Sequence, residues 1–161
     1  MMDFYTFLQL LTVSIIATAA MTWFSYFMSK QFQELYKEPV LLSFVLSKFK
    51  MESSVKSEKT MGWLLHFLIG FLFVFVYHVL WVRDILPISI LSALLLGAIS
   101  GIIGIISWMF IFKISNHQPQ IDFKGYYLQL FFAHLIFGIT ATAFYSLSLT
   151  FLILAKTYVT I

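Results

Sequence analysis

Long apolar runs, separated by short polar segments, are the main pattern of this chain. Each run exceeds the roughly 20 residues that an α-helix needs to cross a hydrocarbon core about 30 Å thick. No run contains Asp, Glu, Lys or Arg. The pattern predicts an all-α fold: a polytopic four-transmembrane-helix bundle forming one integral membrane domain over 1–161, with helices at about 4–28, 61–82, 85–112 and 126–155.

The longest stretch outside these runs is 30–60. Pro39 could open a short helix over 40–50, in which Leu41, Phe44 and Val45 are apolar, and we expect such a helix to lie in the headgroup region. The alternative is a solvated loop with scattered apolar residues. The polar stretch 51–60 is typical of a linker.

Basic residues are concentrated in two of the connections. The first and second runs, and the third and fourth runs, are joined by segments that hold Lys30, Lys37, Lys48, Lys50, Lys56, Lys59, Lys113 and Lys124. The opposite side has only Arg83 and Lys156. By the positive-inside rule the Lys-rich segments are cytoplasmic and both termini lie outside. The first run lacks a basic leader and is too long for a cleavable signal, so we expect a multi-pass membrane protein that keeps all four helices.

Composition narrows the class of protein. The chain is 61% hydrophobic and 11% charged, which a soluble chain of 161 residues could not bury. It has no cysteine, so disulfides and thiolate metal sites are excluded. No basic, aromatic-rich helix lies outside the apolar runs, which argues against nucleic acid as a partner. The expected partners are the lipid bilayer and other membrane proteins or a second copy of the chain.

One motif, H-x3-G-x6-Y, occurs twice inside the apolar runs. The first copy is His66, Gly70 and Tyr77, and the second copy is His134, Gly138 and Tyr145. Imidazoles in hydrocarbon need a partner, so two of them in matching positions suggest a shared role. The motif predicts an internal repeat of two parallel helical hairpins.

Helical geometry separates the motif into two parts. At about 100° per residue its members share one stripe, but each His lies about 16 Å along the axis from its Tyr, so the two cannot share a small site. The Gly one turn from each His leaves room for a neighbouring helix or a flat ligand.

Small residues form stripes on the other two runs. We expect these stripes to serve helix packing. They comprise Ser14, Thr18, Thr22 and Ser25 on the first run, and Gly97, Gly101 and Gly104 on the third.

Three short motifs resemble those of a known family. They are Ala17-Thr18-x-x-Met21-Thr22, the run from Gly62 to Gly70 (GWLLHFLIG), and Ala133-His134-Leu135-Ile136-Phe137-Gly138. They resemble an uncharacterised family of four-helix bacterial membrane proteins, catalogued as a domain of unknown function. The resemblance implies a four-span bundle in the bacterial inner membrane and supplies no activity.

The functional prediction rests on the reactive residue types that the apolar runs lack. Without a carboxylate in the spans, a proton relay, metal hydrolysis or an assisted nucleophile is disfavoured, and no catalytic residue is assigned. We expect a non-enzymatic interaction or accessory protein, or a lipid-contacting one, in which the histidines are interhelical hydrogen-bonders. A small-molecule transporter or membrane enzyme is a further alternative.

A more specific alternative is that the protein binds a cofactor. A b-type haem could lie between His66 and His134 as axial ligands, with Gly70 and Gly138 leaving room for the macrocycle. These histidines would be metal ligands only if haem is bound.

Overall fold

The structure, a computed structural model, describes residues 3–48, 55–114 and 119–159, and the elements within these ranges are α-helices. Four helices are long and apolar enough to cross a membrane, which confirms the predicted all-α, four-span fold. Their bounds are α1 Phe4–Phe32, α3 Val55–Val82, α4 Ile90–Ile114 and α5 Phe123–Val159, and a shorter helix, α2, covers Glu38–Lys48.

Local capping groups decide where two of the helices begin. The predicted starts at 85 and 126 are wrong, because α4 begins at Ile90 and α5 at Phe123. Pro87 precedes α4, and the Ser89 hydroxyl accepts a hydrogen bond from the Ser92 N–H at 3.2 Å. The Asp122 carboxylate accepts one from the Lys124 N–H at 3.1 Å. Both are N-terminal caps, which satisfy amides that have no partner inside the helix.

The connection between the first two spans is more ordered than expected. The short helix starts at Glu38 rather than at residue 40, with Pro39 in its first turn, where a missing N–H costs nothing. The expected linker over 51–60 is wrong in its second half, because α3 already begins at Val55. Residues 49–54 lie outside the part of the chain that the structure describes.

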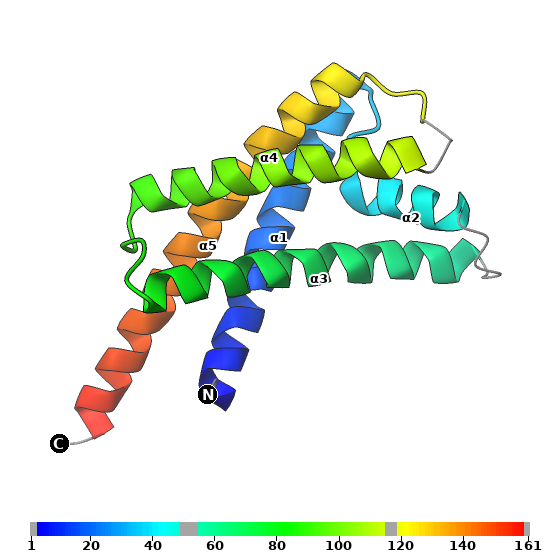
Figure 1. Ribbon diagram of the computed structural model, residues 1–161. Coiled ribbons are helices and arrows are strands. Elements are labelled where there is room, and N and C mark those ends of the chain that lie inside the picture. Colours follow the sequence, from blue (N-terminus) through cyan, green and yellow to red (C-terminus); the bar gives the residue numbers. More distant parts are fainter. Residues whose placement is uncertain (1–2, 49–54, 115–118, 160–161) are drawn as a thin grey trace.

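The helices are arranged in two crossing pairs. Figure 1 shows α1 and α5 side by side, with α3 and α4 lying across them and both termini toward one side of the molecule. Extensive backbone packing joins α4 to α5, α1 to α5, α1 to α3 and α2 to α3. Although α3 and α4 follow one another in the chain, they do not pack closely along their length, and α2 lies near their Lys-rich ends (Figure 1).

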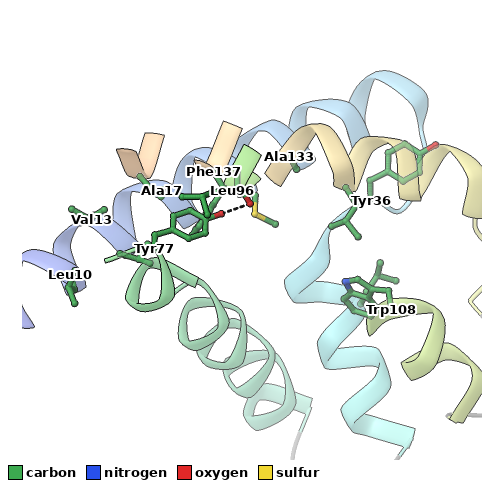
Figure 2. Packing of buried hydrophobic residues seen from close by; sticks show 14 of the residues in the cluster. Leu10, Val13, Ala17, Tyr36, Tyr77, Leu96, Trp108, Ala133 and Phe137 are labelled. Carbon is green, nitrogen blue, oxygen red and sulfur yellow. Dashed lines mark hydrogen bonds between the residues drawn. The ribbon is translucent and has the colours of Figure 1, made fainter. Parts of the chain in front are cut away.

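A polar contact holds α3 to α4 near their short connection. The buried Tyr77 hydroxyl on α3 lies 3.0 Å from the Leu96 carbonyl oxygen and 2.6 Å from Ser100 Oγ, both on α4 (Figure 2). Its ring meets Phe137 of α5 edge to face, with ring centroids 6.0 Å apart. The aromatic core therefore closes this end of the bundle and leaves space between α3 and α4 toward the Lys-rich end.

Candidate functional site

A cavity of about 380 Å³ lies between the helices, and all five contribute to its lining. Its volume is within the range of roughly 300–1,000 Å³ that is usual for small-molecule sites. Its walls are mainly apolar, with Ile69 and Leu72 of α3 facing Ile103 and Trp108 of α4. The polar residues that line it are Thr18, Glu38, His66, Ser107 and His134.

Glu38 is the charged residue of this cavity, and it is only 2% exposed. One carboxyl oxygen, Oε1, accepts hydrogen bonds from Ser25 Oγ of α1 at 2.7 Å and from Gln129 Nε2 of α5 at 3.4 Å. The other oxygen, Oε2, is buried and has no hydrogen-bond partner among the described residues. Burial raises the pKa of Glu38 to about 7, because the charged carboxylate loses its hydration.

Sequence reasoning missed this carboxyl group. The four apolar runs hold no Asp or Glu, as stated, but α2 folds back against α3 and brings Glu38 in from the connecting segment. The absence of a carboxylate from the spans therefore does not keep one out of the core. Two signals could have pointed to it. Glu38 precedes Pro39 at the start of an apolar helix, and Gln129 is an amide within the fourth apolar run.

His66 is held by a hydroxyl of the neighbouring helix. Its Nε2 lies 2.9 Å from Thr22 Oγ1 of α1, and that hydroxyl donates to the Thr18 carbonyl oxygen at 2.6 Å. Because the Thr22 proton is already used, the network assigns the other proton to His66 Nε2, which donates to Thr22. The ring also meets Trp63 edge to face.

His134 is held by its own helix and fits against a glycine. Its Nδ1 lies 2.8 Å from the Leu130 carbonyl oxygen, which can only accept, so Nδ1 donates and Nε2 is left as an acceptor. A Cβ atom at Gly104 of α4 would come within 3.2 Å of that Nε2. Gly104 therefore gives the imidazole its place beside the cavity.

Only some residues of the two motif copies line the cavity. His66, Gly70 and His134 line it, whereas Gly138 does not and instead packs on Ala93 and Gly97 of α4. Gly70 packs in turn against the Thr18 hydroxyl of α1, so each Gly faces the preceding spanning helix. The duplication itself stays a prediction.

The two tyrosines of the motif make different bonds. Tyr77 bonds to α4, whereas the Tyr145 hydroxyl lies 2.8 Å from Nδ1 of His78 on α3. Both lie away from the cavity lining. The His and the Tyr of each copy therefore act in separate places, as their spacing along the helix predicts.

The small-residue stripes face the interior. Ser14, Thr18, Thr22 and Ser25 of α1 are all buried. Each glycine of the α4 stripe lies against α5, and an added Cβ would meet His134 from all three positions, Gly97, Gly101 and Gly104. The α4 stripe therefore packs within the chain around one of the cavity histidines.

The side chains that line the cavity can be compared with the ligands that haem would need. Among the described residues no three His, Asp or Glu are grouped so as to hold a metal ion. Both histidines line one cavity, but ligation by His66 through Nε2 would require the bond to Thr22 to break. Gly138 lies against α4 and leaves no room there for a macrocycle. Haem binding stays a prediction.

Fold and cavity together define the class: a multi-pass helical membrane protein with a buried carboxyl group and two histidines around one inter-helix cavity. The chain matches no protein-family model, no curated protein and no solved structure. The resemblance to an uncharacterised four-helix family therefore stays a prediction.

Proposed function

We propose that this protein is a non-enzymatic membrane protein that binds an amphipathic, lipid-like molecule in the cavity between α3 and α4. The observation that carries the proposal is the distribution of polarity in the cavity: Glu38, His66 and His134 approach it amid apolar walls. This is the usual pattern of a small-molecule site, in which apolar walls give affinity and a few polar groups fix orientation.

The cavity is reached from the lipid-facing side of the bundle. Ile69, Leu72 and Ile103 line the cavity and are also 42%, 53% and 47% exposed. A hydrocarbon chain entering between α3 and α4 would keep apolar surroundings along its whole path. A ligand already dissolved in the bilayer could therefore bind without crossing water.

The hydrogen bonds favour binding over catalysis. The proton of Thr22 is directed to the Thr18 carbonyl oxygen, so His66 does not activate that hydroxyl as a nucleophile. The Nδ1 of His134 donates to a backbone carbonyl oxygen rather than to an orienting carboxylate. We therefore assign the site no reaction. The surrounding bilayer, and other membrane proteins or a second copy of the chain, are the partners we propose.

The proposed location is the bacterial inner membrane, with the Lys-rich end of the bundle in the cytoplasm. The excess of lysines beside α2 and at the α4–α5 connection supports this orientation. It places Glu38 and the two histidines in the inner-leaflet half of the bundle.

Photolabelling tests the proposal. Purified protein in nanodiscs is irradiated with a neutral dodecanol that carries a diazirine, and the modified residues are mapped by mass spectrometry. We expect saturable labelling at Phe73 and Phe137, since both line the cavity and Phe137 is only 1% exposed to the surroundings. An excess of unlabelled dodecanol should compete.

Two neighbouring positions on α3 provide the control. Ile69→Trp should fill the cavity and abolish labelling at Phe137, whereas Leu68→Trp, on the lipid-facing surface outside the cavity, should leave it unchanged. If only lipid-facing residues are labelled, or if both variants behave alike, the proposed function is wrong.

Haem is retained as a second candidate because both histidines line the same cavity. Its test is spectroscopic. Protein expressed with haem supplementation and purified should then show a Soret band that His134→Ala removes. Absence of the band in the wild-type protein would eliminate this candidate.

A further inference from the structure

We propose that the polar end of the cavity binds the cationic head of an alkylammonium amphiphile, with the Glu38 carboxylate as its counter-ion. The inference rests on the proposed function above and adds the charge and the chemical class of the ligand.

The first argument is a surplus of acceptors. Glu38 Oε2 and Gln129 Oε1 are both buried and have no hydrogen-bond partner among the described residues. The two side chains are already in contact through Gln129 Nε2 and Glu38 Oε1. A buried acceptor without a donor costs free energy, and an unpaired carboxylate costs more. A cation or a hydrogen-bond donor is what this pair of side chains lacks.

The described part of the chain does not supply that cation. Lys37 is the nearest lysine in sequence, but its Nζ lies over the ring of Tyr26, 4.9 Å from the centroid. The described residues that line the cavity include no Lys or Arg. A phosphate or carboxylate head would therefore meet Glu38 without compensation, so the charges select against anionic lipids.

The remaining lining suits an alkylammonium group. Trp108 of α4 and Phe73 of α3 present aromatic rings to the cavity, and His134 Nε2 is an acceptor. Figure 2 shows Trp108 projecting from α4 beside α2, the helix that carries Glu38. Aromatic faces attract organic cations, more strongly where water is excluded.

Proton exchange follows from this arrangement. When the cation binds, the Glu38 carboxyl releases its proton to solvent and the carboxylate pairs with the ligand. Because the pKa of Glu38 is raised to about 7, affinity should rise with pH up to about that value and then level off.

Other titratable groups do not reverse this direction. Those facing the site are Tyr26 of α1, His66 of α3, and Tyr126 and His134 of α5, whereas the α4 lining brings none. Protonation of either histidine would add a positive charge, and would also weaken binding of a cation at low pH.

The experiment compares two competitors of almost the same shape. Dodecylammonium, which is protonated at both pH values used, and unlabelled dodecanol, which is uncharged at both, each compete with the diazirine-bearing dodecanol for labelling at Phe137. We expect the cation to compete about 30-fold better at pH 8, because leaving a buried charge unpaired typically costs about 2 kcal/mol or more. The preference should shrink at pH 5.5. Glu38→Gln should abolish it, and Glu34→Gln, which alters a carboxylate outside the cavity, should retain it.

The outcomes separate the two proposals. Equal competition by both compounds in the wild-type protein at pH 8, with cavity labelling intact, would overturn the alkylammonium inference and leave the proposed function standing. Absence of cavity labelling would overturn both. If Glu38→Gln does not fold, the pH dependence in wild-type protein decides, and a preference that is unchanged between pH 5.5 and pH 8 would contradict the role of Glu38.

Discussion

At the scale of single residues, the environment of Glu38 explains most of the chemistry of the site. Its carboxyl group is buried between α1 and α5, and only one of its oxygens is hydrogen-bonded within the described chain. The sequence could predict the two histidines, because an imidazole stands out in an apolar run. It could not predict Glu38 as a neighbour, because that placement depends on how α2 packs.

Glu38 should make stability depend on pH. Its pKa is raised from 4.5 to about 7, so between these values the folded protein holds a proton that the unfolded chain has released. The contribution of Glu38 to stability therefore falls as pH rises through this window, by about 3 kcal/mol in total, and is constant above it. Thermal unfolding of wild-type protein and of Glu38→Gln from pH 4.5 to pH 8 measures this change as the difference between the two proteins.

Glu38→Gln isolates this contribution. The amide keeps an oxygen to accept from Ser25 but carries no charge, so we expect a higher unfolding temperature than wild type at pH 8 and a difference between the two proteins that shrinks toward pH 4.5. Glu34→Gln should retain the slope. A Glu38→Gln variant with the wild-type slope would show that another group titrates.

The bond between Tyr145 and His78 gives a second residue-scale prediction. It joins α5 to α3, and interhelical hydrogen bonds in membranes contribute about 1 kcal/mol. Tyr145→Phe should therefore lower stability by about that amount without affecting photolabelling at Phe137. Tyr5→Phe, at an exposed position, serves as the control in the same unfolding assay. Equal stabilities of the two variants would contradict the assignment.

At the scale of elements, α2 shows what the pattern of apolar residues cannot predict. Its apolar residues predict a short helix, but those residues suit a membrane surface and a helix interface equally well. The structure places Leu41 and Val45 in the core, at 0% and 5% exposure. Close contact is possible because Gly62 of α3 lies against Pro39 and Ser43 of α2. Glu38 reaches the cavity because this contact fixes the start of α2.

The contact between α4 and α5 should be sensitive to single methyl groups. A Cβ at Gly97 would lie 2.7 Å from the His134 carbonyl oxygen and 2.9 Å from Leu135 Cα, which are backbone atoms of α5. Gly97→Ala should therefore force the helices apart and cost about 1–3 kcal/mol. At Gly101 the nearest atom is a side-chain carbon of Phe131 at 3.1 Å, which can shift.

Gly101→Ala is the matched control. We expect it to lower the free energy of unfolding by less than Gly97→Ala does in the same measurement. Both variants gain the same helix propensity, so their difference reports packing alone. A larger loss from Gly101→Ala than from Gly97→Ala would contradict the packing described here.

At the scale of the whole molecule, the sequence could predict the four spans because their length and apolarity leave few alternatives. The crossing of α3 and α4 over α1 and α5 could not be predicted in the same way. Apolar helices offer many packing faces, and the observed choice depends on close contacts such as Gly138 on Gly97. The cavity is a consequence of that choice.

Orientation can be measured directly, since the chain has no cysteine. Single cysteines are introduced at Gln120, near the Lys-rich end, and at Arg83, in the opposite connection, both of which are exposed. In intact cells, a membrane-impermeant maleimide should label Arg83→Cys and not Gln120→Cys, and both should react after lysis. The reverse pattern would place the cavity in the outer-leaflet half.

The most direct measurement of the central claim is an experimental structure of the protein in lipid nanodiscs. We predict elongated non-protein density that begins beside Glu38, passes between Ile69 and Ile103 and continues toward the lipid-facing side. Filling of that space by side chains, with α3 and α4 closed against one another and Glu38 directed away from His66 and His134, would contradict the account.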